Sequence, residues 1–137
     1  MSITIEEVSA LRQGDYVIHE NRPLKITKLS KSKTGKHGRA KAHITASDIF
    51  NNKKHVFIES TGDKIDVPCI VTKKYKIMTL EETDDIDIYE VFMVDEDGNT
   101  ITVKISDTDM IDKITKNDDL EATTISFGDE IKIVNVS

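Results

Sequence analysis

Short runs of Ile, Val, Thr and aromatic residues, separated by turn-forming residues, recur along the whole chain. Residues 40–46 show the pattern most clearly, because small apolar residues alternate with Lys41, His43 and Thr45. A period of two is typical of a strand that buries one face. The runs predict strands near residues 16–18, 24–26, 40–46, 56–58, 70–80, 88–94, 101–105, 122–127 and 131–136. The chain is therefore expected to be all-β.

One segment, residues 107–116, has the periodicity of a helix instead. Met110, Ile111 and Ile114 form a single apolar stripe, and Ser106 or Asp107 can cap the first turn. The second half then has three strands, a short helix and two strands, which is the element order of an OB-fold. The first half has only short strands, which favour a small barrel or sandwich.

The join between the halves is expected at residues 66–69, where Pro68 cannot donate a hydrogen bond to a central strand. The sequence thus predicts two domains, residues 1–69 and 70–137.

The balance of basic and acidic residues changes at the same place. Residues 1–68 hold 12 Lys and Arg against 8 Asp and Glu, and residues 69–137 hold 7 against 17, which together give the net charge of −6. Such asymmetry indicates two modules with different surroundings, and it argues against the second half as an independent nucleic-acid binder.

Composition restricts the class of protein further. Hydrophobic residues are 37% of the chain and Trp is absent, so small cores of Ile, Val and Leu are expected. Cys69 is the only cysteine and cannot form an internal disulfide, which favours a reducing compartment. The N-terminus resembles no secretory signal, and no run has the length of a membrane span. We therefore expect a cytoplasmic protein that makes no membrane contact.

The candidate chemistry lies in residues 28–41, a stretch with six cations and no acid. The cations are Lys28, Lys31, Lys33, Lys36, Arg39 and Lys41. Gly35 and Gly38 bracket Lys36 and His37, and glycines there allow the chain to turn sharply. A cluster of like charges repels itself, and a polyanionic partner such as RNA would relieve this. The composition alone also fits a solvated basic hairpin with no partner.

The other candidate functional sites have less support in the sequence. A phosphate-binding Walker loop lacks the first glycine and the Ser or Thr after Lys36. The acids around Asp84–Asp87 and Asp95–Asp97 do not have EF-hand spacing and are interpreted as solvated turns. The three histidines outside the loop lack metal-ligand spacing and are interpreted as ordinary residues: His19, His43 and His55. No metal site and no catalytic residue is predicted, because neither His37 nor Cys69 has a visible catalytic partner.

Residues 32–41, Ser-Lys-Thr-Gly-Lys-His-Gly-Arg-Ala-Lys, strongly resemble the hypusine loop of the translation initiation factor 5A family, distant relatives of bacterial elongation factor P. Three further segments share this resemblance: Gly14-Asp15-Tyr16 with Arg22-Pro23, Asp48-Ile49-Phe50, and Asp66-Val67-Pro68. The likeness is strong in the first half and weak in the second. It implies an N-terminal SH3-like barrel followed by a C-terminal OB-fold.

The same resemblance implies a function centred on Lys36. Deoxyhypusine synthase would add an aminobutyl group from spermidine to Lys36, and deoxyhypusine hydroxylase could complete hypusine. The modified side chain would contact peptidyl-tRNA on the ribosome, with a binding loop of Lys33, Thr34, Gly35, Lys36, His37, Gly38, Arg39 and Lys41. The factor would assist slow peptide bonds, notably at consecutive prolines, and termination. No cofactor is implied beyond the spermidine-derived group.

Two alternatives remain at the level of sequence. One is an RNA-binding module with an unmodified basic loop, and the other is an enzyme, for which no catalytic constellation is visible. The number of subunits is left open.

Overall fold

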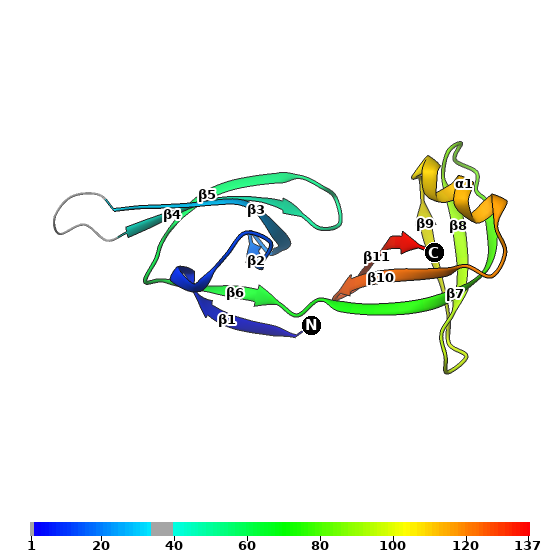
Figure 1. Ribbon diagram of the computed structural model, residues 1–137, viewed down its shortest axis with the longest axis horizontal. Helices are drawn as coiled ribbons and strands as arrows, with labels where there is room; N and C mark the ends of the chain where they lie inside the picture. Colours follow the sequence, from blue (N-terminus) through cyan, green and yellow to red (C-terminus); the bar gives the residue numbers. More distant parts are fainter. Residues whose placement is uncertain (1, 34–39) are drawn as a thin grey trace. The chain divides into compact units, whose positions relative to one another are not determined.

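The computed structural model describes residues 2–33 and 40–137, and it divides into two compact units, Met1–Cys69 and Ile70–Ser137. Both units consist mostly of antiparallel strands, and one α-helix occurs among the described residues. The all-β prediction is confirmed (Figure 1). No helix in the described part of the chain has the length and apolar character to cross a membrane.

The described residues of the first unit form six strands and one short 3-10 helix. They are β1 (Ile3–Glu7), η1 (Val8–Ala10), β2 (Tyr16–His19), β3 (Arg22–Lys33), β4 (Ala40–Asp48), β5 (Lys54–Ser60) and β6 (Lys64–Pro68). One sheet has the order β2-β3-β4-β5, and β1 pairs with β6 in a second, two-stranded sheet. Both sheets curl around one core, which is the SH3-like barrel that the family resemblance implies.

The alternation in β4 determines how this core packs. Ala42, Ile44 and Ala46 are fully buried, as their period of two predicts, whereas His43 between them is exposed. Val17 of β2 and Leu24 of β3 are also fully buried in the same cluster. Small alanines on the inward face leave room for these larger side chains, so a strand poor in bulky residues still lines the core.

The turn between β2 and β3 has only two residues, Glu20 and Asn21, with φ angles of 52° and 63°. Positive φ at both central positions is the geometry of a type I′ hairpin turn, which matches the twist of the flanking strands. The strand predicted near residues 24–26 begins earlier than expected, because Arg22 and Pro23 belong to β3. Pro23 is tolerated there because pairing of β3 with β4 begins only at Leu24.

Two strands of the first unit were not predicted, β1 and β6. All five residues of β1 are exposed, so the segment lacks the alternation that marks a half-buried strand. β6 ends at Pro68, which lies opposite Ile3 in the two-stranded sheet. Pro68 was interpreted as part of the join between the two domains. Its missing N–H is tolerated where it lies, because a residue at the end of a strand in a two-stranded sheet need not donate to a second neighbouring strand.

The second unit has the element order of the predicted OB-fold. Its elements are β7 (Val71–Glu82), β8 (Tyr89–Val94), β9 (Thr100–Ile105), α1 (Thr108–Lys116), β10 (Glu121–Phe127) and β11 (Glu130–Val136). The sheet order is β11-β10-β7-β8-β9, so the chain after the helix returns to the opposite side of β7 (Figure 1). Asp107 caps the helix by accepting a hydrogen bond from the Met110 N–H at 3.1 Å, and Ile114 is buried as predicted.

Asp95, at the turn between β8 and β9, differs from its interpretation as a solvated residue. Its side chain is only 2% exposed, and Lys73 of β7 donates to it at 2.7 Å. The N–H groups of Asp97 and Asn99 also donate to this carboxylate, at 2.9 and 2.8 Å. The hydrogen bond from Lys73 outweighs the effect of burial and holds the pKa of Asp95 far below its usual range. Gly98 completes the turn at a φ of 85°.

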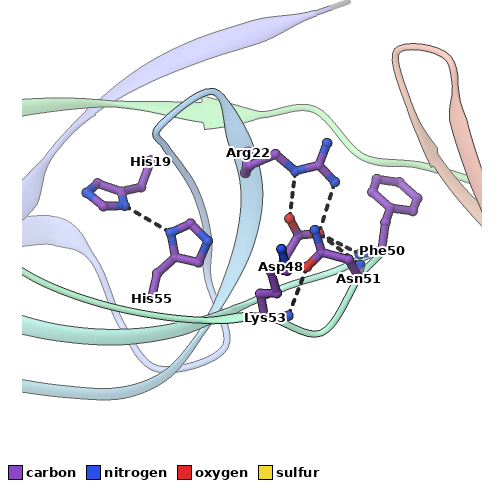
Figure 2. A network of polar contacts seen from close by, with 7 residues as sticks. All are labelled: His19, Arg22, Asp48, Phe50, Asn51, Lys53 and His55. Atoms are coloured by element: carbon purple, nitrogen blue, oxygen red, sulfur yellow. Dashed lines mark hydrogen bonds and ion pairs between the residues drawn. The ribbon is translucent and has the colours of Figure 1, made fainter.

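Asp48 at the end of β4 forms the corresponding network in the first unit (Figure 2). Arg22 donates from Nε to Asp48 Oδ2 at 2.6 Å and from Nη2 to Oδ1 at 3.1 Å. The N–H groups of Phe50 and Asn51 also donate to Oδ1, at 2.9 and 3.2 Å. Burial alone would raise the pKa of Asp48, but these donors lower it from 3.8 to about 2. The carboxylate therefore joins the start of β3 to the turn after β4.

Replacing Asp48 with Ala is expected to destabilise the first unit by about 2–4 kcal/mol, because the buried carboxylate is removed and two turn N–H groups lose the acceptor that it supplies. Urea unfolding, followed by the amide NMR signals of Ala42 and Val91, measures the two units separately. Asp66→Ala is the matched control, because Asp66 lies on β6 and is exposed. That control should change stability by less than about 0.5 kcal/mol. Equal effects of the two substitutions would contradict the role of the network.

The first unit should also lose stability in acid. Folding lowers the pKa of Asp48 to about 2, from an unfolded-state value of about 4. The ionised carboxylate therefore contributes its full stabilisation above about pH 4, and this contribution is lost as the pH falls from there toward about 2. Urea midpoints of the Ala42 signal measured across that range should fall more steeply in the native chain than in Asp48→Asn. A decline of the same slope in both proteins would assign the acid sensitivity to other groups.

Candidate nucleic-acid interface

The β3–β4 hairpin carries the segment that the sequence analysis predicts to be functional. Lys33 lies opposite Ala40 in the last pair of the ladder, so residues 34–39 connect the two strands. Lys33 thus ends β3, and Lys41 is the second residue of β4. The other predicted loop residues lie outside the described part of the chain: Thr34, Gly35, Lys36, His37, Gly38 and Arg39.

A bulge in β3 interrupts the hairpin before it reaches that segment. The register shifts between Ile26 and Lys28, and the hydroxyl of Thr27 donates to the Thr45 carbonyl at 3.1 Å. Toward β2, the N–H of Ile26 donates to the carbonyl of Asp15, the residue before that strand, at 2.8 Å. A bulge bends a strand and increases its local twist. It therefore separates the part of β3 that packs with β2 from the part that leads to residues 34–39.

Hydrogen bonds anchor the base of the hairpin, meaning here the strand ends next to residues 34–39, to neighbouring segments. The Ala40 carbonyl accepts from the Thr61 N–H at 3.0 Å, and the Thr61 carbonyl accepts from the Ser9 N–H at 2.9 Å. Lys31 Nζ donates to the Ser9 carbonyl at 2.7 Å. The two strand ends that flank residues 34–39 are therefore held by the turn after β5 and by η1.

Polar side chains line up across β3, β4 and β5 on the face opposite the core. Ser32, Lys41 and Ser60 lie side by side in the register, and Lys41 Nζ donates to Ser60 Oγ at 3.0 Å. The hydroxyl of Ser32 lies 3.1 Å from Nε2 of His43. Lys28, farther along β3, is exposed. This face presents cations and neutral hydrogen-bonding groups, which are the groups that contact phosphates and sugars.

Two histidines interpreted as ordinary residues lie together. Nδ1 of His19 is 3.1 Å from Nδ1 of His55 (Figure 2). The His19 ring also stacks on Phe57, with ring centroids 3.9 Å apart. Glu20 contributes a third potential ligand atom to this group. Sequence spacing could not reveal the group, because His19 and His55 are 36 positions apart in the chain and the barrel brings them together.

Cys69 ends the first unit and is partly exposed, and its N–H donates to the Ser2 carbonyl at 2.9 Å. The Cys69 side chain is therefore neither fully buried nor fully exposed. The Arg22–Asp48 pair was not predicted. Its sequence signal was present, because both residues belong to segments that carry the family resemblance.

Comparison with known proteins identifies the family. A family model described as translation initiation factor 5A-like, N-terminal, matches residues 2–62. The chain is 38% identical over 96 residues to translation initiation factor 5A of Methanothermobacter thermautotrophicus, an alignment that covers 67% of this chain and 74% of that protein. It is 41% identical over 76 residues to eukaryotic translation initiation factor 5A-1 of Schizosaccharomyces pombe, covering 56% of this chain and 48% of that protein. The match thus spans only about half the length of the fission-yeast relative.

A solved structure extends the similarity to both units. The structure named eukaryotic translation initiation factor 5A from Methanococcus jannaschii aligns with a TM-score of 0.80 and 27% identity. The alignment covers 98% of this chain and 95% of that chain. The weak sequence likeness of the second half is therefore accompanied by a shared fold. On the family model, the archaeal relative and this structural match, the chain belongs to the translation initiation factor 5A family.

Proposed function

We propose that this translation factor acts through Lys36, extended to deoxyhypusine or hypusine, and contacts peptidyl-tRNA on the ribosome. The observation that carries the proposal is the anchored β3–β4 hairpin, whose last pair, Lys33 with Ala40, brackets the six residues that contain Lys36. Family membership supports the same residue, because residues 32–41 have the sequence of the hypusine loop.

The chemistry of the modification fits a narrow RNA site. Deoxyhypusine synthase would transfer the aminobutyl group of spermidine to Lys36, and deoxyhypusine hydroxylase would add a hydroxyl group. The product is a long, thin side chain with two amines, which reaches places that a folded domain cannot enter. Lys33, Arg39 and Lys41 would neutralise phosphates and set the position of the loop, with Thr34, Gly35, His37 and Gly38 shaping it.

The factor would assist the ribosome without taking part in the chemistry. Holding the end of peptidyl-tRNA in a reactive orientation reduces the entropic cost of attack by the incoming amine. This effect is largest where the bond forms slowly, as at consecutive prolines, and the same contact would support termination. The factor itself would supply no base, nucleophile or cofactor and would work in the cytoplasm. We also propose that residues 1–69 and 70–137 are separate domains.

A second candidate is an RNA-binding protein with an unmodified basic loop. The polar face of Lys41, Ser32 and Ser60 would suit that role as well, because it offers phosphate-binding groups without any modification. Intact-mass analysis of protein from its native cells separates the two. A gain of one aminobutyl or hydroxylated aminobutyl group, mapped to Lys36, supports the first candidate, and an unmodified Lys36 in active protein supports the second.

Lys36→Arg is expected to fold normally and to lose activity on messages with consecutive prolines, because Arg keeps the charge but cannot be extended. Reconstituted translation of a proline-rich and a proline-free message measures the effect. Lys28→Arg is the matched control, since Lys28 is an exposed cation on β3 outside the loop. Full activity of Lys36→Arg on the proline-rich message would exclude the modified lysine as the working group.

Ribosome binding should weaken as salt rises, because cations of the loop displace counterions from phosphates. Lys41→Gln should lower the slope of log affinity against log salt by about 0.7–0.9, the value for one lost phosphate contact. Lys74→Gln, an exposed position on β7 in the acidic unit, should leave the slope unchanged. A slope that responds to Lys74 and not to Lys41 would place the contact elsewhere.

A further inference from the structure

Three residues from two strand ends of the first unit form a cluster of potential metal ligands: His19, Glu20 and His55. His19 is the last residue of β2, Glu20 opens the two-residue turn to β3, and His55 is the second residue of β5. One ligand atom from each lies within 4.8 Å of the other two. The two histidine rings point toward one another in Figure 2, with their Nδ1 atoms 3.1 Å apart.

We propose that this cluster binds a divalent transition-metal ion, with Zn²⁺ the best fit. Two imidazole nitrogens and one carboxylate are a common donor set for zinc, with metal–ligand distances of about 2.0–2.2 Å. Two nitrogens bound to one tetrahedral ion at such distances lie about 3.4 Å apart. The Nδ1–Nδ1 distance of 3.1 Å needs only a small adjustment to accept the ion.

The histidine pair is already oriented by its surroundings. The His19 ring lies flat on Phe57, with 3° between the ring planes, and Phe57 in turn packs against the core. The rings of His19 and His55 are nearly perpendicular, at 84°. Both side chains are partly buried, which limits the freedom that binding would remove. The Glu20 residue is exposed, so its carboxylate can move the remaining distance toward the ion.

A hydrogen bond between two neutral imidazoles also explains the 3.1 Å contact. In that case one Nδ1 carries a proton and the other accepts it. Metal binding through both Nδ1 atoms requires the other tautomer in the donor ring, with its proton on Nε2. The adjacent carboxylate favours the metal, because it supplies a third donor and a negative charge beside the two nitrogens.

An ion bound at this cluster would affect the stability of the first unit, because of where the cluster lies in the sheet. β2 and β5 are the two edges of the four-stranded sheet, so no ladder hydrogen bonds join them. An ion held by His19 and His55 would link one edge to the other and close the barrel on that side. A ligand that binds only the folded state stabilises it in proportion to its concentration. Three protein ligands would leave one position open to water or to a donor from a partner.

Calorimetric titration of the full chain, free of any purification tag, with Zn²⁺ tests the proposal. We expect one saturable site that includes His55, and a melting temperature of the first unit that rises by about 5 °C at saturating zinc. His55→Gln should abolish both effects, and Glu20→Gln should weaken binding about tenfold or more. His43→Gln is the matched control, because His43 is an exposed histidine of the same sheet that lies outside the cluster.

A second measurement needs no substitution. Long-range ¹H–¹⁵N spectra of the native chain should show the Nδ1 signals of His19 and His55 shifting together as zinc is added, while the His43 signals stay in place. Absence of these shifts, or undiminished zinc binding by a folded His55→Gln protein, would leave the pair as a simple hydrogen bond and overturn the proposal. Since neither result involves Lys36 or translation, the outcome is independent of the proposed function.

Discussion

The ion pair between Arg22 and Asp48 fixes the register of the β3–β4 hairpin. It lies at the open end of the hairpin, opposite to the end that residues 34–39 connect. Arg22 begins β3, Asp48 ends β4, and the pair Leu24–Asp48 opens the ladder. A slip of one residue in such a ladder would exchange its two faces, which would expose Ala42, Ile44 and Ala46. The register set by this pair, with one extra residue at Thr27, makes Lys33 and Ala40 the closing pair. It therefore determines which six residues connect the strands.

Sequence alternation was sufficient for most strands and for the helix, because each buries one face and repeats it over several residues. Ala42, Ile44 and Ala46 are an example, and Met110, Ile111 and Ile114 are the helical counterpart. It failed for β1, whose residues are all exposed, and for β6, which is short. These two strands pair with each other at a separation of about sixty residues. Local periodicity carries no information about such pairing.

The Asp95 network and the histidine pair were beyond sequence reasoning for the same reason. Asp95 sits in a run of acids that resembles an ordinary solvated turn, and the cation that pairs with its buried carboxylate, Lys73, lies on β7. His19 and His55 become neighbours only when the sheet curls. The candidate loop was the opposite case, because its motif is contiguous and specific. Spacing alone indicated a basic hairpin, and the resemblance to a known family was needed to single out Lys36.

Lys31 and Lys41 show how the base of the hairpin can serve structure and binding together. Each donates one hydrogen bond within the protein, Lys31 to the Ser9 carbonyl and Lys41 to Ser60. An ammonium group has three donors, so these bonds leave donors for a phosphate. Both acceptors are neutral, which means that the positive charge is not cancelled. A lysine held in this way has already lost much of its side-chain freedom, and a phosphate contact would cost less entropy than one made by an unrestrained lysine. The bonds that brace the hairpin would therefore also lower the entropic cost of the proposed contact with a polyanionic partner.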